Sequence, residues 1–481
     1  MTGNRKASRS RLQKRAPRAP LAESQGTLMV EAIASGGEGV GRIDGLACFV
    51  PRTAPGDRAQ VAYVTHARHA RGRVLQLLET AATRVAPRCI HYERDRCGGC
   101  QLQHLAASEQ QDARVQIVRD ALRRIGRREI DVPQLTVGKQ WAYRGRITLT
   151  LLKRSAGWVG GLHPHDDASR VFALTECPIS HPALVQAWLA LAPFLRGLPE
   201  ASKLRLGIRL VASDSGADRV ALVVEGGALW PESVGWARRV AATHPPIQWV
   251  WWAGASGARV LLHGDAGSDS AADGVSDATI DPTQHRPLPD APIDDMAPHG
   301  FEAVEALAFA QVNREVATAL HAFVLEQVRS FDPSTVIDGY AGVGSLSEAL
   351  ARTGVRVTAI ESDHAATRRA ELRMAGLDTE LKSRVQVLST TMEAGLSQAL
   401  PADVVVLNPP RRGVDRAVTA LLADAAGAGV RAIVYVSCDP ATLARDLARL
   451  GAWSIHQVRC FDMFPQTAHV ETVCVLVPEK S

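Results

Sequence analysis

The sequence predicts an α/β protein whose C-terminal part forms a doubly wound parallel sheet, preceded by a small β-barrel and a central mixed α+β domain. Two observations carry this prediction. From about Phe301 the chain alternates helical stretches with short buried strands, which is the pattern of a doubly wound sheet. Between Gly26 and Glu79, short strands separated by Gly, Pro and Asp turns indicate a small barrel instead.

The composition of the 481 residues, 46% hydrophobic and 22% charged, is typical of a globular protein. We expect a cytoplasmic protein, because no uncharged apolar run approaches the roughly 18 residues of a membrane span and no apolar stretch follows the basic N-terminus. Eight cysteines are too few for a disulfide scaffold in a chain of this length. Their spacing must reflect metal ligation, catalysis or burial.

Residues 1–24 form a basic tail that we expect to be disordered. The first 20 residues carry seven Lys or Arg and no acid, a charge of +7, whereas the rest of the chain sums to −2. Like charges without apolar periodicity do not bury a core, and they suit a polyanionic partner.

Residues 25–85 are predicted to form the barrel, of the oligonucleotide-binding (OB) type. Its expected strands are Leu28–Ile33, Leu46–Val50, Ala59–Val64 and Gly72–Leu77. Arg68, His69, Arg71 and Arg73 add positive charge beside them. Composition alone supports a nucleic-acid-binding barrel and a plain β-module with a solvated basic face equally well.

Residues 86–300 are predicted to form the central domain, which is mixed but mostly β. Its expected elements are the strands Arg146–Leu152, Leu206–Val211 and Val220–Val224 and the helices Ser108–Arg124 and Ala183–Leu195. Residues 265–297 form an acidic insertion with eight Asp, whose spacing matches no calcium loop. We expect this insertion to be solvated and flexible.

Residues 301–481 carry the doubly wound sheet. A helix over Val304–Val328 is expected before the first strand. The expected strands are Ser334–Ile337, Val355–Ile360, Val385–Leu388, Asp403–Leu407, Arg431–Val436 and Thr472–Val477.

The first strand of this domain ends in Asp338-Gly-Tyr-Ala-Gly-Val-Gly344, and the second ends in Glu361. Glycines let the backbone turn tightly and approach a ligand. An acid at the next strand end accepts hydrogen bonds from ribose hydroxyls. The spacing is not G-x-G-x-x-G and no phosphate-binding lysine follows, so the pattern favours S-adenosylmethionine over a dinucleotide or a nucleoside triphosphate.

Three further candidate site residues lie next to the ends of predicted strands. Asn408-Pro-Pro-Arg-Arg-Gly413 ends the fourth strand, and its two prolines fix an extended turn that leaves the Asn408 amide facing the crevice. Cys438 comes between a strand and a helix, where we expect a lowered thiol pKa and an activated nucleophile. Glu471 precedes a strongly apolar strand, as a surface charge or as a base held in a low-dielectric site. Cys460 and Cys474 are expected to be buried and inert.

Together these motifs resemble a known family. Asn408–Gly413, Ser437–Asp446 (Ser-Cys-Asp-Pro-Ala-Thr-Leu-Ala-Arg-Asp) and Asp462–Glu471 (Asp-Met-Phe-Pro-Gln-Thr-Ala-His-Val-Glu), in this order, look like the RNA (uracil-5-)-methyltransferases. Phe309–Asn313 and Arg96–His104 resemble that family as well. The barrel is similar to the TRAM domain that begins many members. The resemblance implies a Rossmann-like methyltransferase domain and an S-adenosyl-L-methionine-dependent enzyme.

The resemblance also implies roles for single residues. Cys438 matches the family's nucleophile and Glu471 its general base. The family's methyl-donor contacts fall on Gln311, Tyr340, Ser345, Glu361, Thr391 and Asn408, where Ser345 replaces a common Asn and the alignment of Thr391 is less secure.

The chemistry of uracil then gives a mechanism. C5 is a poor nucleophile until a thiolate adds to C6, so Cys438 would form a covalent adduct and Glu471 would later remove the C5 proton. A stacked uracil cannot reach both groups, and the base must be flipped out.

Cys89, Cys97, Cys100 and Cys177 remain. All-cysteine ligation with a C-x2-C core suits a [4Fe–4S] cluster or a structural zinc, and spacing does not choose between them. The resemblance implies the cluster, because the family's rRNA members hold one with three N-proximal cysteines and one distant Cys-Pro. Methyl transfer needs no electron, so we expect a structural or RNA-shaping cluster.

The function that we favour is that of a 23S rRNA uracil-5 methyltransferase. We expect it to act as a monomer, to bind rRNA and not to associate with a membrane. A tRNA uracil-5 methyltransferase is the alternative within the class. A non-catalytic RNA-binding iron–sulfur protein and a small-molecule methyltransferase are the alternatives from other classes.

Overall fold

The computed structural model describes residues 22–211, 217–255, 258–264, 311–426 and 428–479. Over these residues the chain forms two compact units, 22–32 with 38–82, and 33–37 with 83–479. The predictions for the basic tail, residues 1–24, and for the acidic insertion, residues 265–297, lie almost wholly outside the described residues. The domain limits that we derived from the sequence stay predictions.

The N-terminal sheet has six strands in the order β1-β5-β6-β4-β3-β2. The strands are β1 (Glu23–Met29), β2 (Ala32–Ile33), β3 (Gly39–Ile43), β4 (Leu46–Val50), β5 (Arg58–Thr65) and β6 (Ala70–Glu79). The predicted strand Leu28–Ile33 is wrong as a single element, because Val30 leaves the ladder to donate to the Asp57 carbonyl at 2.9 Å. Leu28, Val30 and Val61 contribute to the apolar core of this unit.

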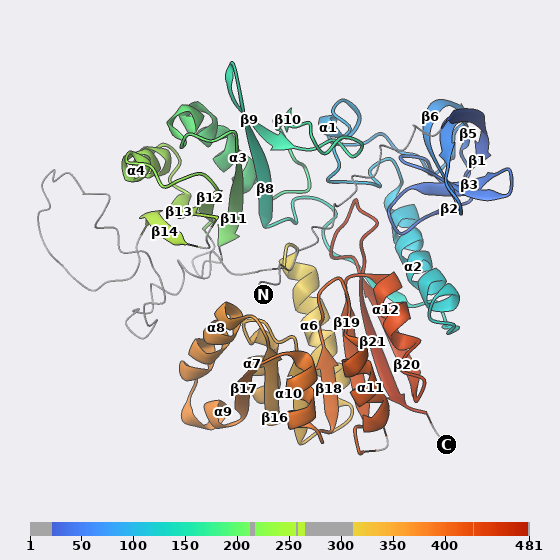
Figure 1. Cartoon of the computed structure of the whole chain (residues 1–481), viewed down its shortest axis with the longest axis vertical. Coiled ribbons are helices and arrows are strands. Elements are labelled where there is room, and N and C mark those ends of the chain that lie inside the picture. Colours follow the sequence, from blue (N-terminus) through green and yellow to red (C-terminus); the bar gives the residue numbers. More distant parts are fainter. Residues whose placement is uncertain (1–21, 212–216, 256–257, 265–310, 427, 480–481) are drawn as a thin grey trace, which may run out of the picture. The chain divides into compact units, whose positions relative to one another are not determined.

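The central sheet has seven strands in the order β10-β9-β8-β11-β12-β13-β14 (Figure 1). The strands are β8 (Arg146–Arg154), β9 (Gly157–Leu162), β10 (Phe172–Ala173), β11 (Lys203–Val211), β12 (Arg219–Glu225), β13 (Ile247–Ala253) and β14 (Arg259–His263). Helices α3 (Pro182–Leu191) and α4 (Ser233–Thr243) cover one face and bury Trp188 and Trp236 in a shared core. The predicted helix Ala183–Leu195 ends earlier, since a 3-10 turn (Ala192–Gly197) takes over where Pro193 stands.

The C-terminal sheet has eight strands in the order β17-β16-β15-β18-β19-β21-β20-β7. They are β7 (Gln134–Thr136), β15 (Thr335–Gly339), β16 (Arg356–Glu361), β17 (Val385–Ser389), β18 (Val404–Leu407), β19 (Ala432–Ser437), β20 (Trp453–Phe461) and β21 (Glu471–Pro478). The strands β17 to β19 are parallel, and β21 is antiparallel to β19. The predicted doubly wound sheet is confirmed.

Helices cover both faces of this sheet. They are α6 (Arg314–Arg329), α7 (Ser345–Ala351), α8 (His364–Ala375), α9 (Thr379–Ser383), α10 (Met392–Ala399), α11 (Arg416–Ala425) and α12 (Pro440–Leu447). One apolar core lies under α6 and α7, and a second lies under α10, α11 and α12. Cys460 and Cys474 are fully buried in the second core, as predicted.

Two helices precede the central sheet. They are α1 (Ile90–Glu93) and α2 (Ala107–Arg124), and α2 packs against α12 with Val118 and Leu122 in the C-terminal core. Of the predicted helix Val304–Val328, the part before residue 311 lies outside the described residues. The described helix α6 begins only at Arg314, because the side chain of Asn313 accepts from the Val316 amide at 3.3 Å and ends the extended segment before it.

Among the residues that the structure describes, there is no helix with the length and apolar character needed to cross a membrane.

Candidate functional site

The glycine loop and Asn408 lie side by side at one edge of the C-terminal sheet. β15 and β18 are neighbours, with Gly339 in register with Leu407, so Tyr340 and Asn408 follow directly after paired residues. The backbone amide of Asn408 donates to the Gly339 carbonyl at 3.2 Å, and the Asn408 residue is exposed. The strand order reverses direction at β15, and ligands of open α/β sheets bind at this position.

Glu361 ties the end of β16 to the glycine loop. One of its carboxylate oxygens accepts from the Gly342 amide at 2.9 Å, and the other accepts from the Ser362 and Asp363 amides. Gly342 has φ +58° and Gly344 has φ +75°, the left-handed region in which a side chain is strained. A carboxylate has about four acceptor positions, so Glu361 keeps capacity for a ribose hydroxyl.

Two more predicted donor contacts lie around this edge. Ser345 is the exposed first residue of α7. Thr391 caps α10, its hydroxyl accepting from the Ala394 amide at 3.5 Å, and lies two residues after β17. Gln311 is placed differently, on the segment before α6 whose Asn313 pairs with Arg144.

Cys438 and Glu471 lie at the same end of the β19–β21 ladder. The last pair of this ladder is Ser437 on β19 with Thr472 on β21; Cys438 follows β19 directly, and Glu471 is the first residue of β21. The two groups are close enough for the charge of Glu471 to act on the Cys438 thiol. The structure therefore brings together the thiol and the carboxyl that the sequence motifs single out.

Burial controls the ionisation of this pair. Burial raises the pKa of the Glu471 carboxyl to about 7, although the charge of Arg411 works in the opposite direction. Burial, and after it the negative charge of Glu471, raise the pKa of the Cys438 thiol. The expectation that the helix end lowers this thiol pKa is wrong, because the desolvation of a half-buried sulfur outweighs the favourable charges around it.

Arg411 is a candidate functional residue that the sequence reasoning did not assign. Its positive charge favours the ionised forms of both Cys438 and Glu471. Helix α12 holds its loop, because the Thr442 hydroxyl donates to the Arg411 carbonyl at 3.1 Å and Arg445 donates to the Arg412 carbonyl at 2.7 Å. The signal was its place in the turn after Asn408, at the same sheet edge as Cys438.

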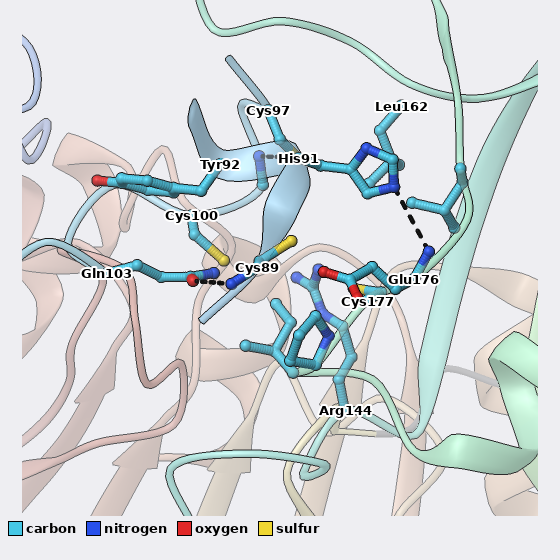
Figure 2. A pocket seen from close by; sticks show the side chains of 14 residues that line it. Cys89, His91, Tyr92, Cys97, Cys100, Gln103, Arg144, Leu162, Glu176 and Cys177 are labelled. Atoms are coloured by element: carbon cyan, nitrogen blue, oxygen red, sulfur yellow. Dashed lines mark hydrogen bonds between the residues drawn. The ribbon is translucent and has the colours of Figure 1, made fainter. Parts of the chain in front are cut away.

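The cysteines at 89, 97, 100 and 177 line one partly open cavity. In Figure 2 the Cys89 and Cys100 side chains point toward this common space, and Arg144 approaches it from the opposite side. Burial raises the pKa of the Cys89 and Cys100 thiols to about 12, and the nearby Cys97 and Cys177 add to both shifts. The four sulfurs are therefore close enough to interact.

Hydrogen bonds fix the segments that carry these cysteines. The Gly99 amide points at Cys97 Sγ at 3.4 Å, and the Ser180 hydroxyl points at Cys177 Sγ at 3.2 Å. Such donors stabilise thiolates that ligate a metal.

Zinc and an iron–sulfur cluster make different demands on this pocket. A zinc ion needs its sulfurs about 2.3 Å from one point. The described residues contain no group of three or more Cys, His, Asp or Glu that could hold one metal ion. His91 and the Glu176 carboxylate line the pocket beside the four cysteines. An iron–sulfur cluster spreads its ligands over several irons.

Comparison with known protein families gives two matches. Residues 299–479 match the tRNA (uracil-5-)-methyltransferase family, and residues 27–72 match the TRAM domain.

Curated relatives match over almost the whole chain. An uncharacterized RNA methyltransferase of Thermosynechococcus vestitus is 32% identical over 470 residues, which cover 93% of this chain and 97% of that protein. A 23S rRNA (uracil(1939)-C(5))-methyltransferase of Azoarcus sp. is 28% identical over 93% of this chain and 99% of its own length.

Among solved structures, the tRNA (uracil-54, C5)-methyltransferase of Pyrococcus abyssi, in complex with S-adenosyl-L-homocysteine, has the same fold. It is 22% identical, with a TM-score of 0.60, over 94% of this chain and 100% of that one. The predicted three-part architecture, with a TRAM barrel, a mixed central domain and a Rossmann-like domain, is confirmed.

Proposed function

Because the chain belongs to the RNA (uracil-5-)-methyltransferases and is an S-adenosylmethionine-dependent enzyme of that class, we propose that it methylates C5 of one specific uridine in cytoplasmic 23S rRNA. Membership of this family argues against the two alternatives from other classes, a non-catalytic RNA-binding protein and a small-molecule methyltransferase. The choice of RNA is the open point.

Near full-length similarity to two 23S rRNA (uracil(1939)-C(5))-methyltransferases, at 28% and 29% identity, supports rRNA as the substrate. A tRNA is the second candidate, favoured by the description of the family that matches residues 299–479. The basic tail, the TRAM barrel and the cysteine set suit a large folded RNA, and we place rRNA first.

We assign the chemistry to Cys438 and Glu471. The Cys438 thiol loses its proton and adds to C6 of the uracil, which makes C5 nucleophilic. C5 then takes the methyl group, Glu471 removes the C5 proton, and the C6–S bond breaks to regenerate the thiolate. Their placement at the same end of the β19–β21 ladder supports these roles, since one flipped-out base can lie against both side chains.

We assign the methyl donor to the edge of the sheet. When bound, S-adenosylmethionine supplies an electrophilic methyl group on a sulfonium. Glu361, which accepts from the Gly342 amide, would also accept from the ribose hydroxyls, and the loop after Tyr340 would contact the donor with its backbone. The proposed contact residues are Gln311, Tyr340, Ser345, Glu361, Thr391 and Asn408.

A cluster of arginines from the central sheet and α8 suits the RNA backbone. Arg209 on β11 lies directly opposite Arg146 on β8. Burial, together with the charges of Arg146, Arg259 and Arg369, lowers the pKa of Arg209 to about 10. Like charges held this close repel one another, and phosphates relieve that repulsion.

We propose that Cys89, Cys97, Cys100 and Cys177 hold a [4Fe–4S] cluster that shapes the central domain. The fit of the four thiols to one cavity supports this assignment. The methyl transfer moves no electron between cofactors, so these residues serve structure.

Mapping 5-methyluridine by mass spectrometry in rRNA and tRNA from a strain without this gene tests the substrate. Loss of one site from 23S rRNA, restored by the wild-type gene and not by Cys438→Ala, is the expected result. Loss from tRNA instead would overturn the rRNA assignment and leave the chemistry standing. A covalent adduct between Cys438→Ala and 5-fluorouridine RNA would overturn the assignment of the nucleophile.

A further inference from the structure

The segment that leads into Glu471 is held from outside its own sheet. Residues 462–470 connect β20 to β21, and Glu471 is the first residue of β21. Within the described part of the chain, the Glu471 side chain makes no hydrogen bond. The position of its carboxylate therefore depends on the main chain, which is set by the pairing of Glu471 with Phe461 on β20 and by the connection that enters β21 here.

Three successive carbonyls of the connection accept hydrogen bonds from residues 101–143. The Tyr143 hydroxyl donates to the Pro465 carbonyl at 2.9 Å. The Gln101 and Leu102 amides donate to the Gln466 carbonyl at 3.1 and 3.0 Å. Arg114 Nε donates to the Thr467 carbonyl at 3.0 Å.

Helix α2 supplies the side-chain part of this support. Gln110 exchanges two hydrogen bonds with Gln466, at 3.0 and 3.2 Å, and Arg114 donates to Gln110 at 3.3 Å. Arg114 also faces Asp462 at 3.4 Å, and neither side chain has any exposed surface. Gln466 has φ +70°, a conformation that a non-glycine residue keeps only where its surroundings impose it.

We infer that Arg114 and Gln110 are positioning residues for Glu471, which they hold against Cys438 and the substrate through residues 465–467. A buried guanidinium is costly and persists here with its charge opposite Asp462 and its Nε–H on the connection. On the buried face of α2 their neighbours are Ala113, Ile117 and Val118, and besides its bonds to Gln466 the Gln110 side chain donates to the Leu105 carbonyl at 3.0 Å, just before the helix.

The inference rests on the proposed roles of Cys438 and Glu471, and those roles make it testable. Addition of Cys438 to C6 and methylation of C5 precede any need for a base. Only the removal of the C5 proton, which releases the Cys438 sulfur from C6, uses Glu471. A displaced Glu471 would therefore leave methylated RNA covalently bound to the enzyme.

The experiment follows the full-length enzyme on unmodified 23S rRNA with methyl-labelled S-adenosylmethionine. It measures the formation and the decay of the denaturant-resistant, labelled protein–RNA adduct in a single turnover. For Arg114→Met and Gln110→Leu we expect adduct formation within about twofold of wild type and release slowed about 100-fold, the effect of a misplacement near 1 Å. Arg114→Lys should recover part of the release rate, since it keeps a donor and a charge.

Arg119→Met is the matched control. Arg119 lies on the same helix, but its side chain donates to Gln116 of α2 and not to the connection. Its release rate should equal that of wild type. Arg114→Met combined with Asp462→Asn removes the uncompensated buried carboxylate, so that the test remains valid if Arg114→Met alone does not fold.

Equal losses of adduct formation and release in Arg114→Met and Gln110→Leu would overturn the inference and leave a purely structural role. Normal release in both variants would overturn it as well. Glu471→Gln separates this from a failure of the proposed function: if Glu471→Gln releases RNA at the wild-type rate, the assignment of the base is wrong, whatever Arg114 does.

Discussion

At Glu471, burial makes a charged carboxylate costly. The side chain is 7% exposed, and its pKa in the folded protein is about 7, above the value of about 4.3 of an unfolded chain. The folded state therefore binds the proton more tightly, and stability falls as the pH rises from about 4 to 7. We expect Glu471→Gln to raise the free energy of unfolding by about 3 kcal/mol at pH 8, with the gain vanishing at pH 4. Denaturant unfolding at both pH values measures this, and a loss of stability at pH 8 would contradict it.

The raised pKa values of Glu471 and Cys438 predict how the reaction depends on pH. A protonated Glu471 cannot accept the C5 proton, so the release of the adduct should rise with pH around a midpoint near 7. The Cys438 thiol ionises only above its ordinary range, so adduct formation should keep rising into alkaline pH. Single-turnover rates of adduct formation and of adduct release, measured between pH 5.5 and 9.5, check both pH dependences. A release rate independent of pH would speak against Glu471 as the base.

The sequence shows which residues carry the chemistry better than it shows their environment. Cys438 and Glu471 stand out from their motifs, because the residue types around them are specific. The direction of the Cys438 pKa shift could not be predicted, since it depends on burial beside Glu471, which only the β19–β21 pairing creates. No role was predicted for Arg114, although it lies at helical spacing from Ile117 and Val118, a position where an arginine must be buried.

At the scale of elements, arginines on β8, β11, β14 and α8 lie close enough for their charges to act on one another. Each phosphate contact that a protein makes adds about one unit to the slope of log affinity against log salt. We expect Arg209→Gln and Arg259→Gln each to lower this slope for 23S rRNA by about one unit while S-adenosylmethionine binding stays unchanged. Arg205→Gln is the matched control, because Arg205 lies on the same strand as Arg209, pairs with Glu225 at 3.3 Å and is not among the arginines whose charges lower the pKa of Arg209. An unchanged slope in the Arg209 and Arg259 variants would exclude these arginines from RNA binding.

Long periodic elements were predictable, and the irregular ones were not. The parallel strands β15 to β19 follow apolar runs that end at turn residues, and the sequence places them well. β7 was missed, because three residues carry no pattern and the strand exists only through its pairing with Arg459, Cys460 and Phe461. The register of β1 and the break at Val30 likewise depend on Asp57, a partner distant in sequence.

At the scale of the whole molecule, the cysteine cavity joins segments that are far apart in the chain. The Ile90 amide donates to Glu176 at 2.7 Å, and His91 accepts from the Thr175 amide at 3.0 Å. These bonds draw the segment of Cys89 to that of Cys177. A bound cluster would stabilise this junction, since a group that binds only the folded state adds its binding free energy to stability.

We therefore expect protein purified without oxygen to contain iron and acid-labile sulfide in equal amounts. Cys97→Ser and Cys177→Ser should lose both and melt at a lower temperature, whereas the Cys48→Ala variant should keep its iron, because Cys48 is buried in the N-terminal unit and does not line the cavity. Zinc in place of iron would overturn the cluster.

Because Gln101 and Leu102 follow Cys100 directly and donate to the Gln466 carbonyl, loss of iron should also slow release of the RNA adduct more than its formation. Iron removal would then reproduce the kinetics expected of Arg114→Met, and an equal loss of both steps would separate the cluster from the positioning of Glu471.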